Sequence, residues 1–264
     1  MNHKIIEELV KKDYDSIQNN IGNFLKEELE KRKSGGLVFG LSGGIDSAVI
    51  AAICAKFVKE KTLALIMPNS KITPNSDTED AIKIVDNYKI EYKLVDIEFI
   101  HKEYAKYVES NPLSFANLGA RIRANMLYYY ANARNSLVLG SSDRSEFLIG
   151  YFTKFGDGAS DLLPIVSLYK TQIRELAKSL GLSQNVILKP SGPHLWEGHT
   201  AETEIGLNYE EIDSILHCII DKGLAVDETA RITEIPISDV DKIYRMHKKS
   251  EHKRVMATPC TLQG

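Results

Sequence analysis

The sequence predicts an α/β protein built on a parallel β-sheet that helices cover on both faces. Three observations lead to this fold class. Short apolar segments alternate with helical segments between residues 36 and 139. A glycine-rich turn at 40–47 joins the first apolar segment to a helical one, and polar side chains follow each strand end. Because ligands bind at the carboxyl ends of the strands in such sheets, we expect these polar residues to meet at one rim.

The spacing of apolar residues predicts each element in turn. Residues 3–33 place apolar side chains on one face, which predicts a single N-terminal helix. The strands are predicted at 36–39, 62–67, 91–95 and 136–139. Helices are predicted between and beside them, at 48–58, 76–88, 98–108 and 114–134.

The glycine-rich turn is the most informative stretch of the chain. Its residues are Gly40, Leu41, Ser42, Gly43, Gly44, Ile45, Asp46 and Ser47. Unpaired backbone N–H groups at a helix start bind anions, and glycines let the backbone approach a phosphate closely. A carboxylate at Asp46 would repel that phosphate unless a cation lies between them, which predicts Mg²⁺. The turn has neither the Gly-Lys-Ser/Thr ending of a Walker A loop nor the G-x-G-x-x-G of a dinucleotide fold.

Beyond residue 209 the pattern becomes helical, with helices predicted at 209–220, 227–235 and 238–246. The last two are a candidate helix-turn-helix DNA reader, since a basic run accompanies them: Arg245, Lys248, Lys249, Lys253 and Arg254. One short basic run on a chain of net charge −3 is weak support for DNA binding. A solvated helix end, or a clamp on an anionic small molecule, explains the run better.

Length and composition suit one soluble globular domain. The 264 residues are 43% hydrophobic and 26% charged. No apolar run approaches the roughly 18 residues of a membrane span, and the three cysteines form no C-x-x-C pair, so we expect a cytoplasmic, reduced protein that binds neither membrane nor nucleic acid. Within a single domain, 1–264, we expect an N-terminal helix (1–34), an α/β core (35–190), and a lid loop with C-terminal helices (191–264).

The turn resembles the SGGxDS pyrophosphate loop of the N-type ATP pyrophosphatases, which cleave ATP to AMP and pyrophosphate. Further motifs make the chain similar to the ammonia-dependent NAD⁺ synthetases over nearly its whole length. They are Asn117–Arg123, Gly140–Glu146, Gly150–Gly158, Leu168–Gln172 and Glu251–Arg254. The resemblance implies a flavodoxin-like, doubly wound sheet of the adenine nucleotide α-hydrolase type. It also implies a homodimer that catalyses the final step of NAD⁺ biosynthesis, the amidation of deamido-NAD⁺ (nicotinate adenine dinucleotide) by free ammonia with ATP and Mg²⁺.

The same resemblance implies roles for individual residues. The loop at 40–47 would hold the pyrophosphate of ATP, Lys170 would reach the ATP phosphates, and Ser141 and Ser191 would contact ATP. Asp46 and Glu146 would bind Mg²⁺, and Glu146 is alternatively an acidic first-turn residue that the helix dipole favours. Deamido-NAD⁺ would contact Arg121, Lys154, Asp161, His252 and Lys253. Asp157 or Asp161 would assist the loss of a proton from ammonium, and the sequence does not choose between them.

The helix at 114–134 would lie at the dimer interface of the family. The run Leu127-Tyr128-Tyr129-Tyr130 suits such a contact, because aromatic residues are enriched at interfaces, and it suits an internal core equally well.

Two segments depart from the usual motifs of the family. An added acid stands at Asp143 within Gly140–Glu146, and the lid has Ala201 where an acid is usual. The second departure leaves the contacts of Gly198–Glu202 and of Ser191 open.

The alternatives are another ATP pyrophosphatase, such as a GMP synthetase or a tRNA-modifying enzyme, and a non-catalytic nucleotide-binding or DNA-binding regulator. A tRNA modifier usually has an RNA-binding appendage or a sulfur-relay cysteine pair, and the sequence has neither. Paired acids at Asp46 and Glu146 argue against a mere sensor, which needs no pyrophosphate loop.

Overall fold

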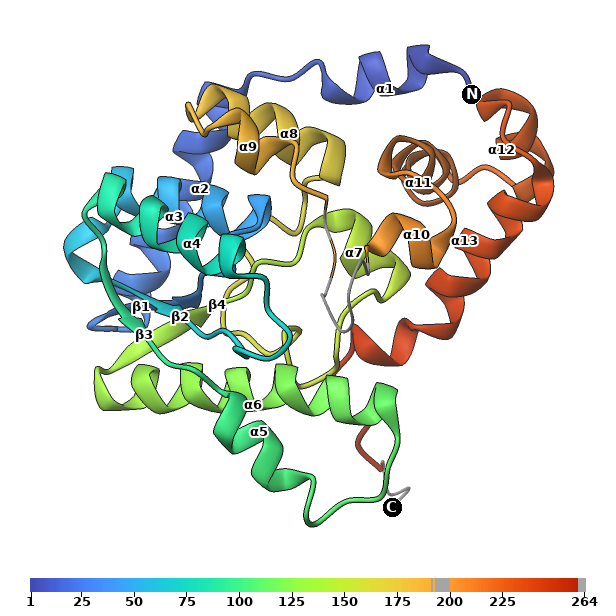
Figure 1. Cartoon of the computed structure of the whole chain (residues 1–264). Helices are drawn as coiled ribbons and strands as arrows, with labels where there is room; N and C mark the ends of the chain where they lie inside the picture. Colours follow the sequence, from blue (N-terminus) through green and yellow to red (C-terminus); the bar gives the residue numbers. More distant parts are fainter. Residues whose placement is uncertain (191, 193–199, 261–264) are drawn as a thin grey trace, which may run out of the picture.

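The computed structural model describes residues 1–190, 192 and 200–260 (Figure 1). Four strands form one parallel sheet: β1 (Gly36–Gly40), β2 (Thr62–Ile66), β3 (Glu91–Leu94) and β4 (Ser136–Leu139). The helices of the core are α2 (Tyr14–Lys31), α3 (Ile45–Phe57), α4 (Asn75–Tyr88), α5 (Glu98–Tyr104), α6 (Pro112–Ala133), α7 (Arg144–Ile149), α8 (Lys170–Ser179) and α9 (Gln184–Ile187). A helical layer completes the chain, formed by α1 (His3–Val10), α10 (Ala201–Ile205), α11 (Tyr209–Leu216), α12 (Val226–Thr233) and α13 (Ile237–Lys249).

The strands lie in the order β3-β2-β1-β4. Val38 of β1 is in register with Leu63 of β2 on one side and Val138 of β4 on the other. The doubly wound parallel class is therefore confirmed. The same strand order occurs in the dinucleotide-binding sheets. From β1 the chain adds β2 and β3 on one side and then returns to add β4 on the other side, so the direction of winding reverses between β1 and β4. This reversal puts the carboxyl ends of β1 and β4 side by side.

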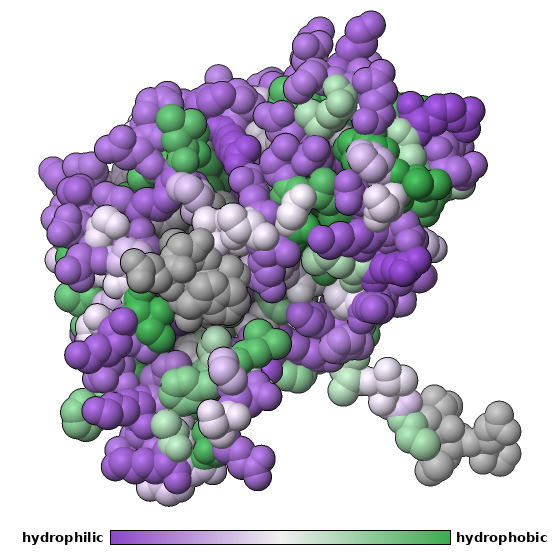
Figure 2. Space-filling model, turned by 45° about the vertical axis from the view of Figure 1, so that its right-hand side comes forward, coloured by the Kyte–Doolittle hydropathy of each residue, from purple (hydrophilic) through white to green (hydrophobic). Residues whose placement is uncertain are grey.

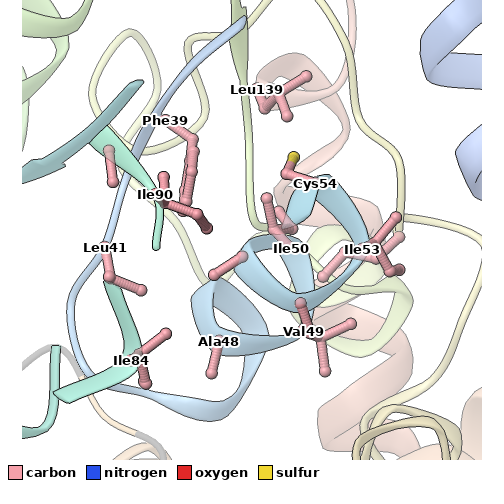
Figure 3. Close-up of a cluster of buried hydrophobic side chains, with 14 of the residues drawn as sticks. Phe39, Leu41, Ala48, Val49, Ile50, Ile53, Cys54, Ile84, Ile90 and Leu139 are labelled. Atoms are coloured by element: carbon pink, nitrogen blue, oxygen red, sulfur yellow. The ribbon is translucent and has the colours of Figure 1, made fainter. Parts of the chain in front are cut away.

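Side chains of alternate strand residues enter two separate cores, as the period of a strand requires. Leu37 and Phe39 pack with α2, α3, α4 and α8, and Figure 3 shows Phe39 and Leu139 pointing toward α3 residues such as Ile50 and Cys54. Val38 and Val138 point to the opposite face, which α6 covers. Helices on both faces confirm the predicted layering.

The C-terminal helices form a third core of their own, beside the sheet (Figure 1). It is built around Tyr209, Ile212 and Ile243, and it includes Leu9 from the N-terminal segment. The first helix reaches this layer because Asn2 N donates to Thr233 O and Gln172 Nε2 donates to Leu9 O. The three helices predicted beyond residue 209 are present, the first continuing as a π-helical turn at His217–Asp221.

Two predictions about individual elements are wrong. Residues 3–33 form two helices, because Asp13 caps the start of α2 by accepting a hydrogen bond from Ser16 N and the chain changes direction there. Strand β3 is exposed at all four of its residues, although a strand covered on both faces was predicted. It lies at the edge of the sheet next to β2.

In the described part of the chain, no helix combines the length and the apolar character needed to cross a membrane. Figure 2 shows a mostly hydrophilic surface on the face it displays, with hydrophobic side chains in small groups.

Candidate functional site

The site lies where the sheet reverses its direction of winding. The glycine-rich turn follows β1 and leads into α3, while residues 140–143 follow β4 and lead into α7. Neighbouring parallel strands end at the same edge, so this topology brings Asp46 and Glu146 together although a hundred residues separate them in sequence.

Gly43 is required by the shape of the turn. Its φ is +82°, and a Cβ at this position would meet the carbonyl oxygen of Asp77 at 2.2 Å. The hydroxyl of Ser47 accepts from Ser42 N at 3.2 Å and donates to Gly44 O at 3.1 Å, which closes the turn from inside. These contacts fix the backbone of the turn, and Ser42 and Gly44 face an adjoining cleft.

Three carboxylates surround one buried ammonium group. The Nζ atom of Lys170 lies 2.7 Å from Asp46 Oδ2, 2.7 Å from Asp143 Oδ2 and 2.9 Å from Glu146 Oε1. We call these four residues the acid–lysine cluster. Lys170 and Asp143 are completely buried, while Asp46 and Glu146 are partly exposed.

Burial and charge shift the protonation equilibria of the cluster in opposite directions. Burial alone would lower the pKa of Lys170, but the facing carboxylates of Asp143, Asp46 and Glu146 raise it well above its ordinary value. Burial raises the pKa of Glu146 to about 8, with Lys170 acting against the shift. Burial also raises the pKa of Asp143. Lys170 is therefore held as a cation.

The cluster fits a divalent cation. Oxygen atoms of Asp46, Asp143 and Glu146 all lie within 4.8 Å of one another. Asp46 Oδ1 is buried without a hydrogen-bond partner among the described residues, so it has an uncommitted lone pair. With all three carboxylates ionised the cluster would carry a net charge of −2, and a magnesium ion would favour this ionised form and supply a cation for the oxygen ligands it prefers.

Asp143 was noted in the sequence only as an unusual acid, and its place in the cluster was missed. Its Oδ1 caps α7 by accepting from Glu146 N at 2.8 Å, and its other oxygen faces Lys170. An aspartate followed three residues later by a glutamate is a helix-start signal that was available. The charge role depends on Lys170, which is 27 positions away.

A cleft of about 790 Å³ opens from the cluster. The end of the cleft next to the cluster is called the loop side. It is lined by Gly40, Leu41, Ser42, Gly44, Ile45, Asp46, Ser141 and Glu146. Gly43 and Ser47 shape the turn from behind. Lys170 lies behind the carboxylates and is not among the lining residues, and its contact with the phosphates of ATP stays a prediction.

The far end of the cleft is formed by α6, the segment 150–158 and the turn at Glu251–Lys253. We call this the tail side. Lys253 Nζ donates to Gly150 O at 2.7 Å and to Phe152 O at 2.8 Å, and Lys253 lines the cleft. Lys154 Nζ donates to His252 O, and Arg121 donates to Lys154 O at 3.3 Å. The structure thus brings together four of the five residues predicted for the dinucleotide, of which Lys253 lines the cleft while Arg121, Lys154 and His252 lie next to it in this chain of contacts.

The fifth of these residues, Asp161, is placed elsewhere. Its Oδ2 accepts from Val138 N at 2.8 Å, beside β4, and it does not line the cleft. Asp157 does line the cleft, where its Oδ1 accepts from Thr153 N at 2.9 Å. Arg123 is a cleft residue that was not assigned from the sequence, and its Nε donates to Met67 O at 2.8 Å. Ser191 and most of the predicted lid (193–199) lie outside the described residues.

The basic run near the C-terminus is largely used within the chain. Arg254 donates to Leu148 O at 2.8 Å and to His247 O at 2.6 Å, and Arg245 pairs with Asp241 at 2.5 Å. Together with the contacts of Lys253, this leaves Lys248 and Lys249 as the exposed lysines of the run. Arg245, Lys248 and Lys249 therefore form one short exposed patch on α13, which is weak support for DNA binding.

Sequence comparison identifies relatives along nearly the whole chain. A family model described as NAD synthase matches residues 17–257. The NH(3)-dependent NAD(+) synthetase of Hyperthermus butylicus is 45% identical over 252 residues, covering 94% of this chain and 91% of the relative. That of Saccharolobus solfataricus is 43% identical over 265 residues, covering 99% and 95% respectively.

Solved structures agree in fold. An NMN synthetase from Francisella tularensis superposes with a TM-score of 0.85 at 32% identity, covering 96% of this chain and all of that one. An NH3-dependent NAD synthetase from Campylobacter jejuni, in complex with nitrate, superposes with a TM-score of 0.81 at 33% identity, covering 95% and 100%.

Proposed function

The chain belongs to the NAD synthase family and is a ligase, and from this premise we propose that it amidates deamido-NAD⁺ with free ammonia, consuming ATP and releasing NAD⁺, AMP and diphosphate. The observation that carries the proposal is the single cleft with a phosphate-binding turn and an acid–lysine cluster at one end and a cationic tail side at the other. The reaction needs both ends of the cleft, because ATP and deamido-NAD⁺ must be bound together for AMP to be transferred before ammonia attacks.

The proposed chemistry explains why ATP is needed. A carboxylate is a poor acceptor for ammonia, because its departing oxygen is too basic. In the first step a carboxylate oxygen of deamido-NAD⁺ attacks the α-phosphorus of ATP, and the bond from that phosphorus to the bridging oxygen of pyrophosphate breaks. In the second step the nitrogen of ammonia attacks the acyl carbon, and AMP leaves with the oxygen that it received.

The loop side suits the first step. Negative charge grows on the leaving pyrophosphate, and the backbone N–H groups of the turn and the start of α3 are preorganised donors for it. Magnesium held by Asp46 and Glu146, with Asp143 beside them, would supply further positive charge to the phosphate oxygens. Lys170 keeps the three carboxylates together in the absence of that ion.

The tail side suits the dinucleotide. Lys253 and Arg123 line the cleft and offer cations for a pyrophosphate, and Lys154 and Arg121 are connected to this side through the backbone carbonyls of His252 and Lys154. Asp157 also lines it, so we propose Asp157 rather than Asp161 as the residue that accepts a proton from ammonium.

We propose that the protein acts as a homodimer through α5, α6 and β3. Phe99 of α5 is 79% exposed and Tyr129 of α6 is 65% exposed, and Tyr107, in the turn between these two helices, is 78% exposed. Exposed apolar side chains gathered on consecutive elements favour a protein partner. Leu127, Tyr128 and Tyr130 pack on the sheet instead, as one of the two predictions for this run requires, and Tyr129 is the residue of the run that we propose for the interface.

The alternatives are less well supported. A tRNA modifier or DNA-binding regulator needs an extended basic surface, and of the basic run Lys253 and Arg254 are used in contacts to backbone carbonyls, which leaves Arg245, Lys248 and Lys249 exposed. A second substrate is worth testing, because the Francisella tularensis neighbour is named an NMN synthetase. Such an enzyme would amidate nicotinate mononucleotide, which has no adenylate half.

The test is to incubate the purified protein with ATP, Mg²⁺ and ammonium, and with either deamido-NAD⁺ or nicotinate mononucleotide. We expect NAD⁺ and AMP in equal amounts from the first mixture and little product from the second. Amidation of the mononucleotide alone would replace the proposed substrate. ATP cleavage without any amide, in folded protein, would refute the amidation.

A further inference from the structure

A buried carboxylate behind the acid–lysine cluster contacts α7 and α8, the two helices at whose starts Asp143, Glu146 and Lys170 stand. Asp213 lies on α11 and is completely buried. Its Oδ1 accepts from Ser145 Oγ at 2.5 Å, and its Oδ2 accepts from Thr171 N at 2.9 Å and Thr171 Oγ1 at 2.8 Å. Ser145 belongs to α7 and Thr171 to α8, so one side chain connects three helices.

These contacts are made at the helix starts, where backbone N–H groups lack partners within the helix. Ser145 Oγ accepts from Lys170 N at 2.9 Å while it donates to Asp213. The first two N–H groups of α8 are therefore satisfied by Ser145 and Asp213. The partial positive charge of a helix start also favours a carboxylate there.

The contacted residues are the direct neighbours of the cluster. Ser145 stands between Asp143 and Glu146, and Thr171 follows Lys170. A shift of α7 against α8 would change the distances from Lys170 Nζ to the carboxylates of α7, which are now 2.7 and 2.9 Å. The geometry of the cluster depends on how these two helix starts are joined.

A second contact comes from the same helix. Tyr209 lies one turn before Asp213, and its hydroxyl donates to Glu146 Oε1 at 3.2 Å. Residues four apart lie on one helix face, so α11 presents both side chains to the back of the cluster. Asp213 does not line the cleft, which separates its role from substrate contact.

We propose that Asp213 is a positioning residue for the ligase reaction, which fixes the starts of α7 and α8 so that Lys170 and the metal-binding carboxylates keep the spacing that activation of ATP requires. The role deepens the proposed function and rests on it. It predicts a loss of turnover with little change in substrate affinity, because no group that touches substrate is removed.

The test compares Asp213→Asn with Gln18→Ala. Gln18 is also buried, and it ties α2 to the other end of α8 by donating to Ser179 Oγ at 2.8 Å, far from the cluster in the chain. We expect D213N to lower kcat by about 10- to 100-fold with KM for ATP changed less than threefold. Q18A should be destabilised, yet keep its kcat below its unfolding temperature.

A readout that does not use activity is the rate at which an acylating reagent modifies Lys170, followed by peptide mass spectrometry. The buried lysine should react slowly in wild type and Q18A and at least several-fold faster in D213N. If the wild-type protein forms no NAD⁺, the proposed function fails, whereas this labelling still tests the positioning.

Two outcomes would overturn the proposal. One is a kcat for D213N within twofold of wild type, with Lys170 still protected. The other is an equal fall in kcat for Q18A at an equal loss of thermal stability. Ser145→Ala provides the measurement if D213N does not fold. It removes one link and leaves Asp213 bound to Thr171, so we expect a several-fold loss of kcat, and no loss would contradict the role.

Discussion

The loop side and the tail side of the cleft are held together in different ways. On the loop side, charged groups are buried against one another, and the turn is fixed by its own hydroxyls and by a glycine with positive φ. On the tail side, cationic side chains near the surface donate to backbone carbonyls of loops. The buried side is preorganised for charge that develops in the reaction, and the exposed side for charge that a substrate brings.

The two sides are therefore expected to respond differently to substitution. Changes on the loop side are expected to lower turnover with any substrate, whereas changes on the tail side should weaken binding of one substrate. The following predictions test that separation, beginning with the largest effect.

Asp46→Ala should reduce formation of both AMP and NAD⁺ by about a thousandfold, because it removes a metal ligand and a charge from the transition state of the first step. The fold should persist, since Lys170 keeps Asp143 and Glu146 as partners. Product assays and thermal unfolding of the same preparation measure the two effects. Activity within tenfold of wild type would remove Asp46 from the catalytic group.

Gly43→Ala should lower turnover by about a hundredfold, because the added Cβ meets Asp77 O at 2.2 Å and the turn must move. Gly181→Ala is the matched control. Gly181 has a similar φ of +72° but nothing within 4 Å of the added atom, so it should cost about 1 kcal/mol of stability and no activity. Equal kinetic effects of the two variants would mean that backbone strain alone explains the first.

Lys253→Ala should raise KM for deamido-NAD⁺ by about tenfold and leave KM for ATP within twofold, since a cation at the tail side is lost. Lys248→Ala removes an exposed lysine five residues earlier and should change neither constant. Steady-state kinetics with each substrate varied in turn gives the comparison. An effect of K253A confined to ATP would reverse the assignment of the two sides.

The last prediction concerns stability and its dependence on pH, where no change in catalysis is involved. Burial raises the pKa of Asp213 to about 7, although hydrogen bonds from Ser145 and Thr171 act against the shift. Because the folded state then binds this proton more tightly than the unfolded state, the contribution of Asp213 to stability should fall as pH rises from about 4 to about 7.

The measurement is the difference in unfolding free energy between wild type and D213N, by denaturant titration across that range. As pH rises, the unfolding free energy of the wild type should fall relative to that of D213N, by no more than about 1.4 kcal/mol per pH unit. A difference that grows in favour of the wild type as pH rises would show that the folded state prefers the ionised carboxylate.

Much of this arrangement could be predicted from sequence because it follows from local rules. The turn at 40–47, the strand ends and the alternation of elements are each encoded within a few residues. Topology then brings Asp46 to Glu146. The break before Tyr14 was also readable, since Asp13 is a good helix cap, but the continuous apolar face of 3–33 concealed it.

The remaining features depend on contacts between distant segments. Asp213 carries no local sign of its role, because Ser145 and Thr171 reach it from two other helices. The burial of Lys170 among three carboxylates likewise emerges only when α7, α8 and the turn after β1 are packed together. The exposure of β3 follows from its place at the edge of the sheet, which spacing along the chain does not encode.

The central claim is that ATP activates the carboxylate of the dinucleotide by transferring AMP to it. The most direct measurement uses deamido-NAD⁺ labelled with ¹⁸O in its nicotinate carboxylate, with ATP, Mg²⁺ and ammonium, followed by mass spectrometry of the products. One labelled oxygen should appear in each AMP, and none in diphosphate. Unlabelled AMP formed together with NAD⁺, or label in diphosphate, would contradict the account.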